Sequence, residues 1–269
     1  MSKKVKVILQ ARTGSNRLYG KALLPISGYE LVVICWKRIK LLNYDTVVAI
    51  PKSQEDNYLA EILKKNKIKF YRGDNDNVFS RFQKITAKMN SEDIVIRVTA
   101  DNPIVDGFLI EKLLKEYKDK KFSYLSSHDN LNNAPYGLQV EIFRVRHLRE
   151  KFQKNKFNLE HVTPVIRKRY LSKNKFSILG LEKFRNLRIT VDNYEDFNRV
   201  YNIFKSSFFN IKKRYIDLLK NYYKKKKNLK KIKIKSNLVL GIWRCFWETG
   251  FFTVSNCTVI RLVRPMSQE

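Results

Sequence analysis

The residues best suited to chemistry gather in a loop near the N-terminus. Residues 8–21 read ILQARTGSNRLYGK, in which Arg12, Arg17 and Lys21 stand among glycine, alanine and serine. Small residues let main-chain N–H groups converge on phosphate oxygens, and the three cationic side chains add full positive charge. The loop therefore predicts a triphosphate-binding site. The alternative interpretation is a solvated basic turn.

The spacing within this loop disfavours two well-known kinds of nucleotide site. A Walker P-loop has four residues between its glycines and a Ser or Thr after its lysine. Here five residues separate Gly14 from Gly20, and Ala22 follows the lysine. The dinucleotide fingerprint Gly-x-Gly-x-x-Gly is also absent from the sequence. An ATPase or GTPase is therefore disfavoured.

Two aspartates that follow strand-like runs form a second candidate cluster. Asp101 follows the β-branched run 94–99, and Asp192 follows residues 187–191. If both runs are strands of one sheet that point the same way, the two carboxylates converge at its carboxyl edge, where they could share Mg²⁺. Helix capping is the alternative for both aspartates, although Asp106 is the better cap for the helix after residue 101.

A third acidic group supports an alternative hypothesis about function. Asp74 and Asp76 flank one asparagine, which matches the Asp-x-Asp pattern with which many glycosyltransferases hold a metal and a nucleotide sugar. The pattern is short, and the same residues are typical of a polar turn that caps the helix expected from about Val78. A glycosyltransferase of the GT-A type remains the second hypothesis.

Alternating strands and helices are expected to position these groups. The spacing of apolar residues predicts an α/β fold with a Rossmann-like, mixed but mostly parallel sheet flanked by helices. The expected strands are 5–9, 46–50, 69–71, 94–99, 135–143 and 187–191. The expected helices are 31–42, 55–65, 78–89, 108–117, 145–153, one that opens near 160–167, and one that follows Asp192 and runs to about 205.

Composition limits the class of protein. The chain has 269 residues with 43% hydrophobic and 13% aromatic residues, which excludes a disordered polyelectrolyte and suits one main domain. Its 55 Lys and Arg against 25 Asp and Glu give a formal charge of +30, which invites a nucleic-acid interpretation. Much of that charge lies in residues 220–235, and no compact nucleic-acid-reading module is present, so nucleic-acid binding is disfavoured.

The composition changes at residue 236. Residues 236–269 contain no lysine, yet they hold two of the three cysteines and two of the three tryptophans. We expect a main domain at 1–235 and an atypical, foreign extension at 236–269. Charged and polar residues interrupt its apolar stretch, so membrane association through this tail is not expected. The cysteine spacing supports neither disulfides nor zinc, and no secretory signal is recognised, so a cytoplasmic location is expected.

Six ordered motifs resemble the cytidylyltransferases that make CMP-activated acidic sugars. Examples are the CMP-ketodeoxyoctonate and CMP-sialate synthetases, and the likeness is greatest to the spore-coat polysaccharide biosynthesis branch. The resemblance covers roughly residues 4–205. Its motifs are residues 10–21, 72–74, 97–103, Gly137 with 140–143, 160–164 and 188–192.

The resemblance implies a fold of the nucleotide-diphospho-sugar transferase type and a nucleotidyl transfer, in which a sugar hydroxyl attacks the α-phosphate of CTP and pyrophosphate leaves. It also implies a homodimer, with residues 124–169 facing the sugar and forming the dimer. The implied residues are Arg12, Lys21 and Asp101 for catalysis; Asp101 and Asp192 for Mg²⁺; Gln10, Ala11, Gly14, Ser15, Arg17, Arg72, Asp74, Arg97 and Thr99 for the nucleotide; and Gln139, Glu160 and His161 for the sugar.

The resemblance leaves three points open. Gln139 and Tyr136 replace acidic residues that are expected in this branch, so the sugar is not specified. From its neighbours alone, His161 is equally compatible with packing and with ligand binding. The sequence identifies no residue as the general base, and a metal-activated hydroxyl could make a general base unnecessary.

Overall fold

A computed structural model describes residues 3–127, 134–151, 156–171 and 181–228. The described residues up to 223 form one compact unit, and residues 224–228, which are helical, belong to a second. The division predicted at residue 236 lies outside the described residues and stays a prediction. None of the helices in the described ranges is long and apolar enough to cross a membrane.

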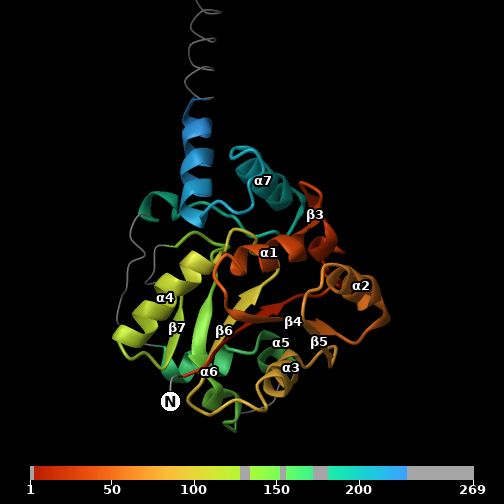
Figure 1. The fold of residues 1–269 in the computed structure, drawn as a ribbon, viewed down its shortest axis with the longest axis vertical. Helices are drawn as coiled ribbons and strands as arrows, with labels where there is room; N and C mark the ends of the chain where they lie inside the picture. The colour runs from red at the N-terminus through yellow and green to blue at the C-terminus, as the bar shows by residue number, and fades with distance from the viewer. Residues whose placement is uncertain (1–2, 128–133, 152–155, 172–180, 229–269) are drawn as a thin grey trace, which may run out of the picture. The chain divides into compact units, whose positions relative to one another are not determined.

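A six-stranded sheet forms the centre of the first unit (Figure 1). The first four strands in its spatial order are parallel, and the fifth is antiparallel to both of its neighbours. This mixed, mostly parallel sheet confirms the predicted fold class. In spatial order the strands are β5 (Phe70–Gly73), β4 (Asp45–Pro51), β1 (Val5–Gln10), β6 (Ile94–Thr99), β8 (Glu141–Arg144) and β7 (Tyr124–Ser126).

Helices cover both faces of the sheet. Alternate strand residues point to opposite faces, so each strand contributes to two apolar cores. Val7 and Leu9 of β1 belong to the larger apolar core, whereas Ile8 between them belongs to the smaller one. The larger core includes residues from α1 (Leu31–Ile39), α2 (Asn57–Lys65), α4 (Gly107–Asp119), α7 (Tyr194–Lys205) and the helical residues 215–223. The smaller core includes residues from α3 (Val78–Ile85), α5 (Lys156–His161) and α6 (Pro164–Tyr170).

The ends of β1 and β6 lie side by side. In the parallel register Gln10 stands opposite Thr99, and the Ala100 N–H donates to the Gln10 carbonyl at 2.9 Å. The loops that leave these two strands therefore start at the same edge of the sheet. Carboxyl ends of parallel strands are where open α/β sheets bind ligands.

One predicted strand is wrong. Residues 187–191 lie outside the six-stranded sheet, because β8 already occupies the edge of β6 on that side. The segment instead bonds to the loops beyond the strand ends: Ile189 N–H donates to the Tyr136 carbonyl at 2.7 Å, and Val191 N–H to the Asp101 carbonyl at 2.8 Å. Gly137 permits this approach, since a Cβ there would lie 2.2 Å from the Thr190 nitrogen.

Two other expected elements are less than half as long as predicted. The strand expected at 135–143 starts only at Glu141, and the helix expected at 145–153 is a 3-10 turn at Val145–Leu148. A two-stranded hairpin of β2 (Pro25–Ile26) and β3 (Tyr29–Glu30), which was not predicted, follows the first loop, with Gly28 at a positive φ of 79° in its turn. A second 3-10 turn at Lys21–Leu23 precedes the hairpin, and two more lie at Gln54–Asp56 and Glu182–Phe184.

Candidate active site

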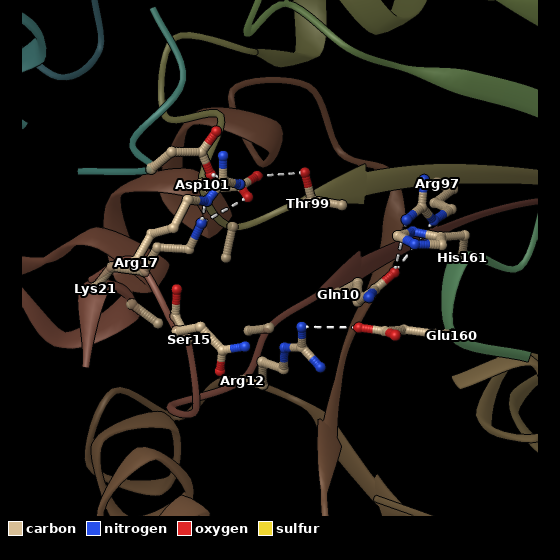
Figure 2. A pocket seen from close by; sticks show the side chains of 15 residues that line it. Gln10, Arg12, Ser15, Arg17, Lys21, Arg97, Thr99, Asp101, Glu160 and His161 are labelled. Atoms are coloured by element: carbon tan, nitrogen blue, oxygen red, sulfur yellow. Dashed lines mark hydrogen bonds and ion pairs between the residues drawn. The ribbon is translucent and has the colours of Figure 1, made fainter. Parts of the chain in front are cut away.

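A cavity of about 320 Å³ lies at the shared edge of β1 and β6 (Figure 2). Its volume is at the lower end of the range of small-molecule sites. The first loop, the segment after β6, helix α5 and the end of the segment before α7 all contribute. Its lining includes eleven residues named from the sequence: Gln10, Ala11, Arg12, Ser15, Arg17, Lys21, Arg97, Thr99, Asp101, Glu160 and His161, with Asp192 as a twelfth.

Lys21 joins the two predicted carboxylates. Its Nζ lies 3.0 Å from Asp101 Oδ2 and 3.0 Å from Asp192 Oδ1, and it also donates to the Val191 carbonyl at 2.9 Å. The Lys21 side chain is only 15% exposed, so solvent screens these contacts weakly. The structure therefore brings Asp101 and Asp192 together around one cation, although the segment before Asp192 is not a sheet strand.

The remaining oxygens of both carboxylates also have partners. Asp101 Oδ1 accepts from the Thr99 hydroxyl at 2.5 Å, and Asp192 Oδ2 accepts from Arg188 at 2.7 Å. Arg17 adds a contact of 2.9 Å to Asp192 Oδ1. All four carboxylate oxygens thus have partners in this structure. Three of these oxygens contact a cationic side chain.

This donor set fits Mg²⁺. The Lys21 ammonium is a positive charge held between two carboxylates. Mg²⁺ in proteins is commonly held in a similar way, by one or two carboxylates plus substrate phosphates. In the described ranges no group of three or more His, Cys, Asp or Glu side chains could hold a metal alone. Asp101 and Asp192 would hold such an ion only together with oxygens from a ligand.

Neither aspartate of the pair caps a helix. Asp106 caps α4 by accepting from the Leu109 N–H at 2.9 Å, as expected from the sequence, and Asn193 caps α7 by accepting from the Asp196 N–H at 2.9 Å. The capping roles are therefore filled by neighbours, which leaves Asp101 and Asp192 with side chains in the cavity.

Arg12 is held by an acidic residue across the cavity. Its Nη2 lies 2.9 Å from Glu160 Oε1, and the two side chains are 48% and 29% exposed. Figure 2 shows this pair spanning from the first loop to helix α5. A phosphate group that enters the cavity would compete with Glu160 for the guanidinium of Arg12.

Arg97 fixes the orientation of Gln10. Its Nε and Nη2 donate to Gln10 Oε1 at 3.1 and 3.0 Å, so the amide nitrogen of Gln10 is turned away from Arg97. The third nitrogen of Arg97 pairs with buried Glu141, which also accepts from the Tyr124 hydroxyl at 2.6 Å and the Thr163 hydroxyl at 2.7 Å. Burial raises the pKa of Tyr124 well above its ordinary value, so Tyr124 stays a neutral donor.

A second cavity of about 740 Å³ adjoins the first and shares Arg17, Arg97, Thr99, Asp101, His161 and Asp192 with it. Gln139 and Tyr136 line this second cavity. His161 lines both cavities, is exposed, and contacts the ring of Phe157 at a centroid distance of 4.6 Å. The predicted sugar-binding residues thus lie next to the carboxylate pair.

Three predicted nucleotide-binding residues lie outside both cavities. Arg72 donates to the carbonyls of Pro51, Lys52 and Ser53 and to Asn57, so it ties β5 to the segment after β4. Asp74 accepts from the N–H groups of residues 76 and 77 at 3.0 and 2.7 Å, as in a polar turn. Gly14 lines a third cavity with Arg12, Asp56 and Asp76 among others.

Comparisons with known proteins agree with this geometry. The sequence profile of the family described as Cytidylyltransferase matches residues 6–236. The chain belongs to this cytidylyltransferase family. Its relatives include the uncharacterized protein MJ1063 of Methanocaldococcus jannaschii, which is 33% identical over 203 residues, or 72% of this chain and 80% of that one.

Further similarities come from one named relative and two solved structures. The spore coat polysaccharide biosynthesis protein SpsF of Bacillus subtilis is 28% identical over 217 residues, 74% of this chain and 86% of that one. A solved cytidylyltransferase from Leptospira borgpetersenii has a TM-score of 0.73 and 23% identity, covering 84% of this chain and 96% of that one. A CMP-2-keto-3-deoxy-manno-octonic acid synthetase complexed with CTP has a TM-score of 0.55 and 14% identity, covering 76% and 100%.

Sequence reasoning missed four charged residues at this site, of which Arg167 and Lys168 line the second cavity. Glu141 and Arg188 occur within the recognised motifs, yet no role was assigned to either. The signal for Glu141 is a carboxylate inside the apolar run VEIF, since such a group needs buried donors. Arg188 precedes Asp192 by four residues, but in an extended segment that spacing predicts no contact, so only the structure reveals their pairing.

Proposed function

We propose that the protein uses CTP to activate an acidic or keto sugar as a CMP-sugar, with Mg²⁺ as cofactor and release of pyrophosphate. The observation that carries this proposal is Lys21 Nζ at 3.0 Å from both Asp101 and Asp192, beneath a loop that also presents Arg12 and Arg17. Cations and carboxylates that alternate at one sheet edge suit a triphosphate with its metal ion.

The cationic side chains of the first loop would bind and orient the triphosphate. The sugar hydroxyl oxygen attacks the α-phosphorus and loses its proton to solvent water, the bond from this phosphorus to the β-phosphate oxygen breaks, and pyrophosphate departs. Negative charge builds on the transferring and leaving phosphates, where Arg12, Arg17 and Lys21 can stabilise it. Mg²⁺ bound at Asp101 and Asp192 would supply further charge neutralisation.

The second cavity is the proposed site of the sugar. Arg167 and Lys168 line it together with the neutral polar side chains of Gln139 and Thr190. Two cationic groups beside hydroxyl and amide groups suit an acidic sugar, whose carboxylate and hydroxyls they would bind. The proposal also includes residues 124–169 as the part of the chain that faces the sugar and forms a homodimer interface.

A substrate screen tests the proposed reaction. The protein is incubated with each of the four NTPs and a panel of acidic and keto sugars, with Mg²⁺, and pyrophosphate is measured. Pyrophosphate formed with CTP, dependent on one sugar, is the expected result. Failure of all combinations, or an equal rate with every NTP in the absence of sugar, would contradict it.

The same screen distinguishes the two alternative functions. A glycosyltransferase would transfer sugar from a nucleotide sugar without forming pyrophosphate. The turn contacts of Asp74 do not favour this alternative, since both of the N–H groups that it binds belong to its own turn. A nucleic-acid-binding module would be retained on nucleic acid in a salt-sensitive manner, without CTP turnover.

Glu160→Gln is expected to lower the KM for CTP by about 2- to 5-fold, because Arg12 then loses its competing partner and an exposed ion pair contributes up to about 1 kcal/mol. Steady-state kinetics with varied CTP measures the effect. Glu150→Gln is the matched control: its pair with Arg169 is similarly exposed, at 28% and 45%, and neither residue lines the two cavities. A raised KM would instead mean that Glu160 contacts the substrate itself.

A further inference from the structure

We propose that Arg188 is a positioning residue that holds the Asp192 carboxylate in place for a divalent cation. This inference rests on the proposed function, because it gives Asp192 the role of metal ligand. Arg188 lines neither cavity, so its effect would act through Asp192 and not through contact with a substrate.

Arg188 connects two aspartates. Its Nη2 donates to Asp192 Oδ2 at 2.7 Å, while its Nε donates to Asp196 Oδ1 and Oδ2 at 2.8 and 3.0 Å. Asp196 lies in the first turn of α7 and is 2% exposed, so it provides a fixed anchor. The planar guanidinium can hold both contacts at once in a rigid geometry, which the single ammonium of a lysine cannot reproduce.

Asp196 holds Asp192 by a second route as well. Its Oδ2 accepts from the backbone N–H of Asp192 at 3.2 Å, so backbone and side chain of Asp192 are both tied to the same carboxylate. Asp196 Oδ1 also accepts from Arg199 at 2.8 Å, so two guanidinium groups hold the anchor.

The face of the Arg188 guanidinium is also supported. Its Cζ lies 4.7 Å from the centroid of the Tyr136 ring, and the backbone of residue 188 forms a parallel bridge with residue 136. The stacking contact and the two carboxylate contacts restrict the Arg188 side chain to one arrangement, although it is 39% exposed. The tyrosine that departs from the expected motif thus supports the residue that holds Asp192.

The contacts divide the two oxygens of Asp192 between separate tasks. Oδ2 faces Arg188, whereas Oδ1 faces Lys21 and Arg17 in the cavity. Fixing Oδ2 from behind sets the direction of Oδ1, which is the oxygen available to a cation that replaces the ammonium of Lys21. Groups that orient a metal ligand commonly change metal affinity by about 10- to 100-fold when removed.

Positioning and simple charge make opposite predictions. Arg188 is a cation beside a metal-binding carboxylate, so by charge alone its removal should strengthen metal binding. If it positions Asp192, its removal should weaken metal binding despite the lost repulsion. Arg188→Lys keeps the charge and loses the two-aspartate contact, and Arg188→Gln loses both, so the pair of variants separates the two effects.

The test is Mn²⁺ binding to the full-length protein, measured by electron paramagnetic resonance in the presence of CTP and without sugar, with the Mn²⁺–CTP signal subtracted. Arg188→Lys and Arg188→Gln should each weaken binding by about 10-fold or more. Arg199→Gln is the control, because Arg199 contacts Asp196 at 2.8 Å and the Arg188 carbonyl, but no atom of the Asp192 side chain. It should bind Mn²⁺ as the wild type does.

A double variant tests whether Arg188 acts through Asp192. In Asp192→Asn the further change Arg188→Lys should have no added effect, because residues that act as one unit are non-additive. Wild-type affinity in Arg188→Lys, tighter binding in Arg188→Gln, or full additivity would each overturn the proposal. Thermal melts identify any variant that fails to fold. If Arg188→Lys does not fold, Asp196→Asn takes its place, because it removes the anchor and should weaken Mn²⁺ binding equally.

Mn²⁺ binding requires no turnover, so the two proposals can fail separately. A wild-type protein that binds Mn²⁺ in an Asp192-dependent manner but forms no pyrophosphate with any NTP and sugar would reject the proposed reaction and leave the Arg188 comparison intact. A protein that forms pyrophosphate while Arg188→Lys binds Mn²⁺ normally would reject the positioning role alone.

Discussion

Lys21→Ala is expected to lower turnover by about 100-fold or more, the scale of losing one preorganised charge where negative charge develops in the transition state. Lys21 is the residue whose Nζ lies within 3.0 Å of both Asp101 and Asp192, so no nearby group can take its place without moving. The effect should appear mainly in kcat, measured from pyrophosphate release at saturating CTP.

The same substitution should also change how Mg²⁺ affects stability. Without the ammonium, Asp101 loses its cationic partner and faces the Asp192 carboxylate, so the melting temperature without metal should fall. Added Mg²⁺ should then raise the melting temperature more in Lys21→Ala than in the wild type, because the ion no longer competes with the ammonium. Thermal melts with and without Mg²⁺ measure this difference.

Lys6→Ala is a matched control for Lys21→Ala. Lys6 pairs with Asp45 at 2.6 Å, and its side chain is 16% exposed against 15% for Lys21, but it lines neither cavity. Its removal should leave turnover and the Mg²⁺ response unchanged. Turnover of the wild-type level in a folded Lys21→Ala protein would place the active site elsewhere.

Asp101→Asn and Asp192→Asn are each expected to lower turnover by about 100-fold at low Mg²⁺ and to raise the Mg²⁺ concentration needed for activation. A metal ion contributes several kcal/mol of charge stabilisation in the transition state, and each 1.4 kcal/mol corresponds to a factor of ten. The Asn side chain keeps the size of Asp, so the fold should be preserved. Titration of Mg²⁺ against activity, with melts in parallel, measures both quantities.

Asn193→Ala provides the control for these aspartate variants. Asn193 follows Asp192 directly and caps α7 through its side chain, so its loss should cost about 1 kcal/mol of stability and leave the Mg²⁺ requirement unchanged. If Asp192→Asn behaved like this control, with lower stability and an unchanged Mg²⁺ requirement, the metal-ligand role of Asp192 would be rejected.

The sequence predicted the parts of the fold that depend on local apolar patterns. Strand 94–99 was predicted with its observed bounds, because its six successive residues are β-branched apart from one arginine. The convergence of Asp101 with the first loop follows from the parallel pairing of β1 and β6. These features depend on short-range periodicity and on the rule for parallel sheets.

The sequence could not predict contacts that depend on the path of the chain beyond the sheet. Residues 187–191 have the composition of a strand, but β8 already occupies the neighbouring edge, so they pair with loops instead. The predicted role of Arg72 came from resemblance, and its four contacts to residues 51–57 are visible only in the structure. Local patterns carry no information on which edge is already filled.

The most direct test of the nucleotide and metal site is the position of Mn²⁺ in crystals of the protein soaked with CTP and Mn²⁺, located by anomalous scattering. We expect a peak between the carboxylates of Asp101 and Asp192, with the triphosphate against the first loop and Lys21 Nζ moved from its position in the present structure. A peak at Asp74 and Asp76 instead, with Lys21 still between the two carboxylates, would contradict the proposed site and favour the glycosyltransferase alternative.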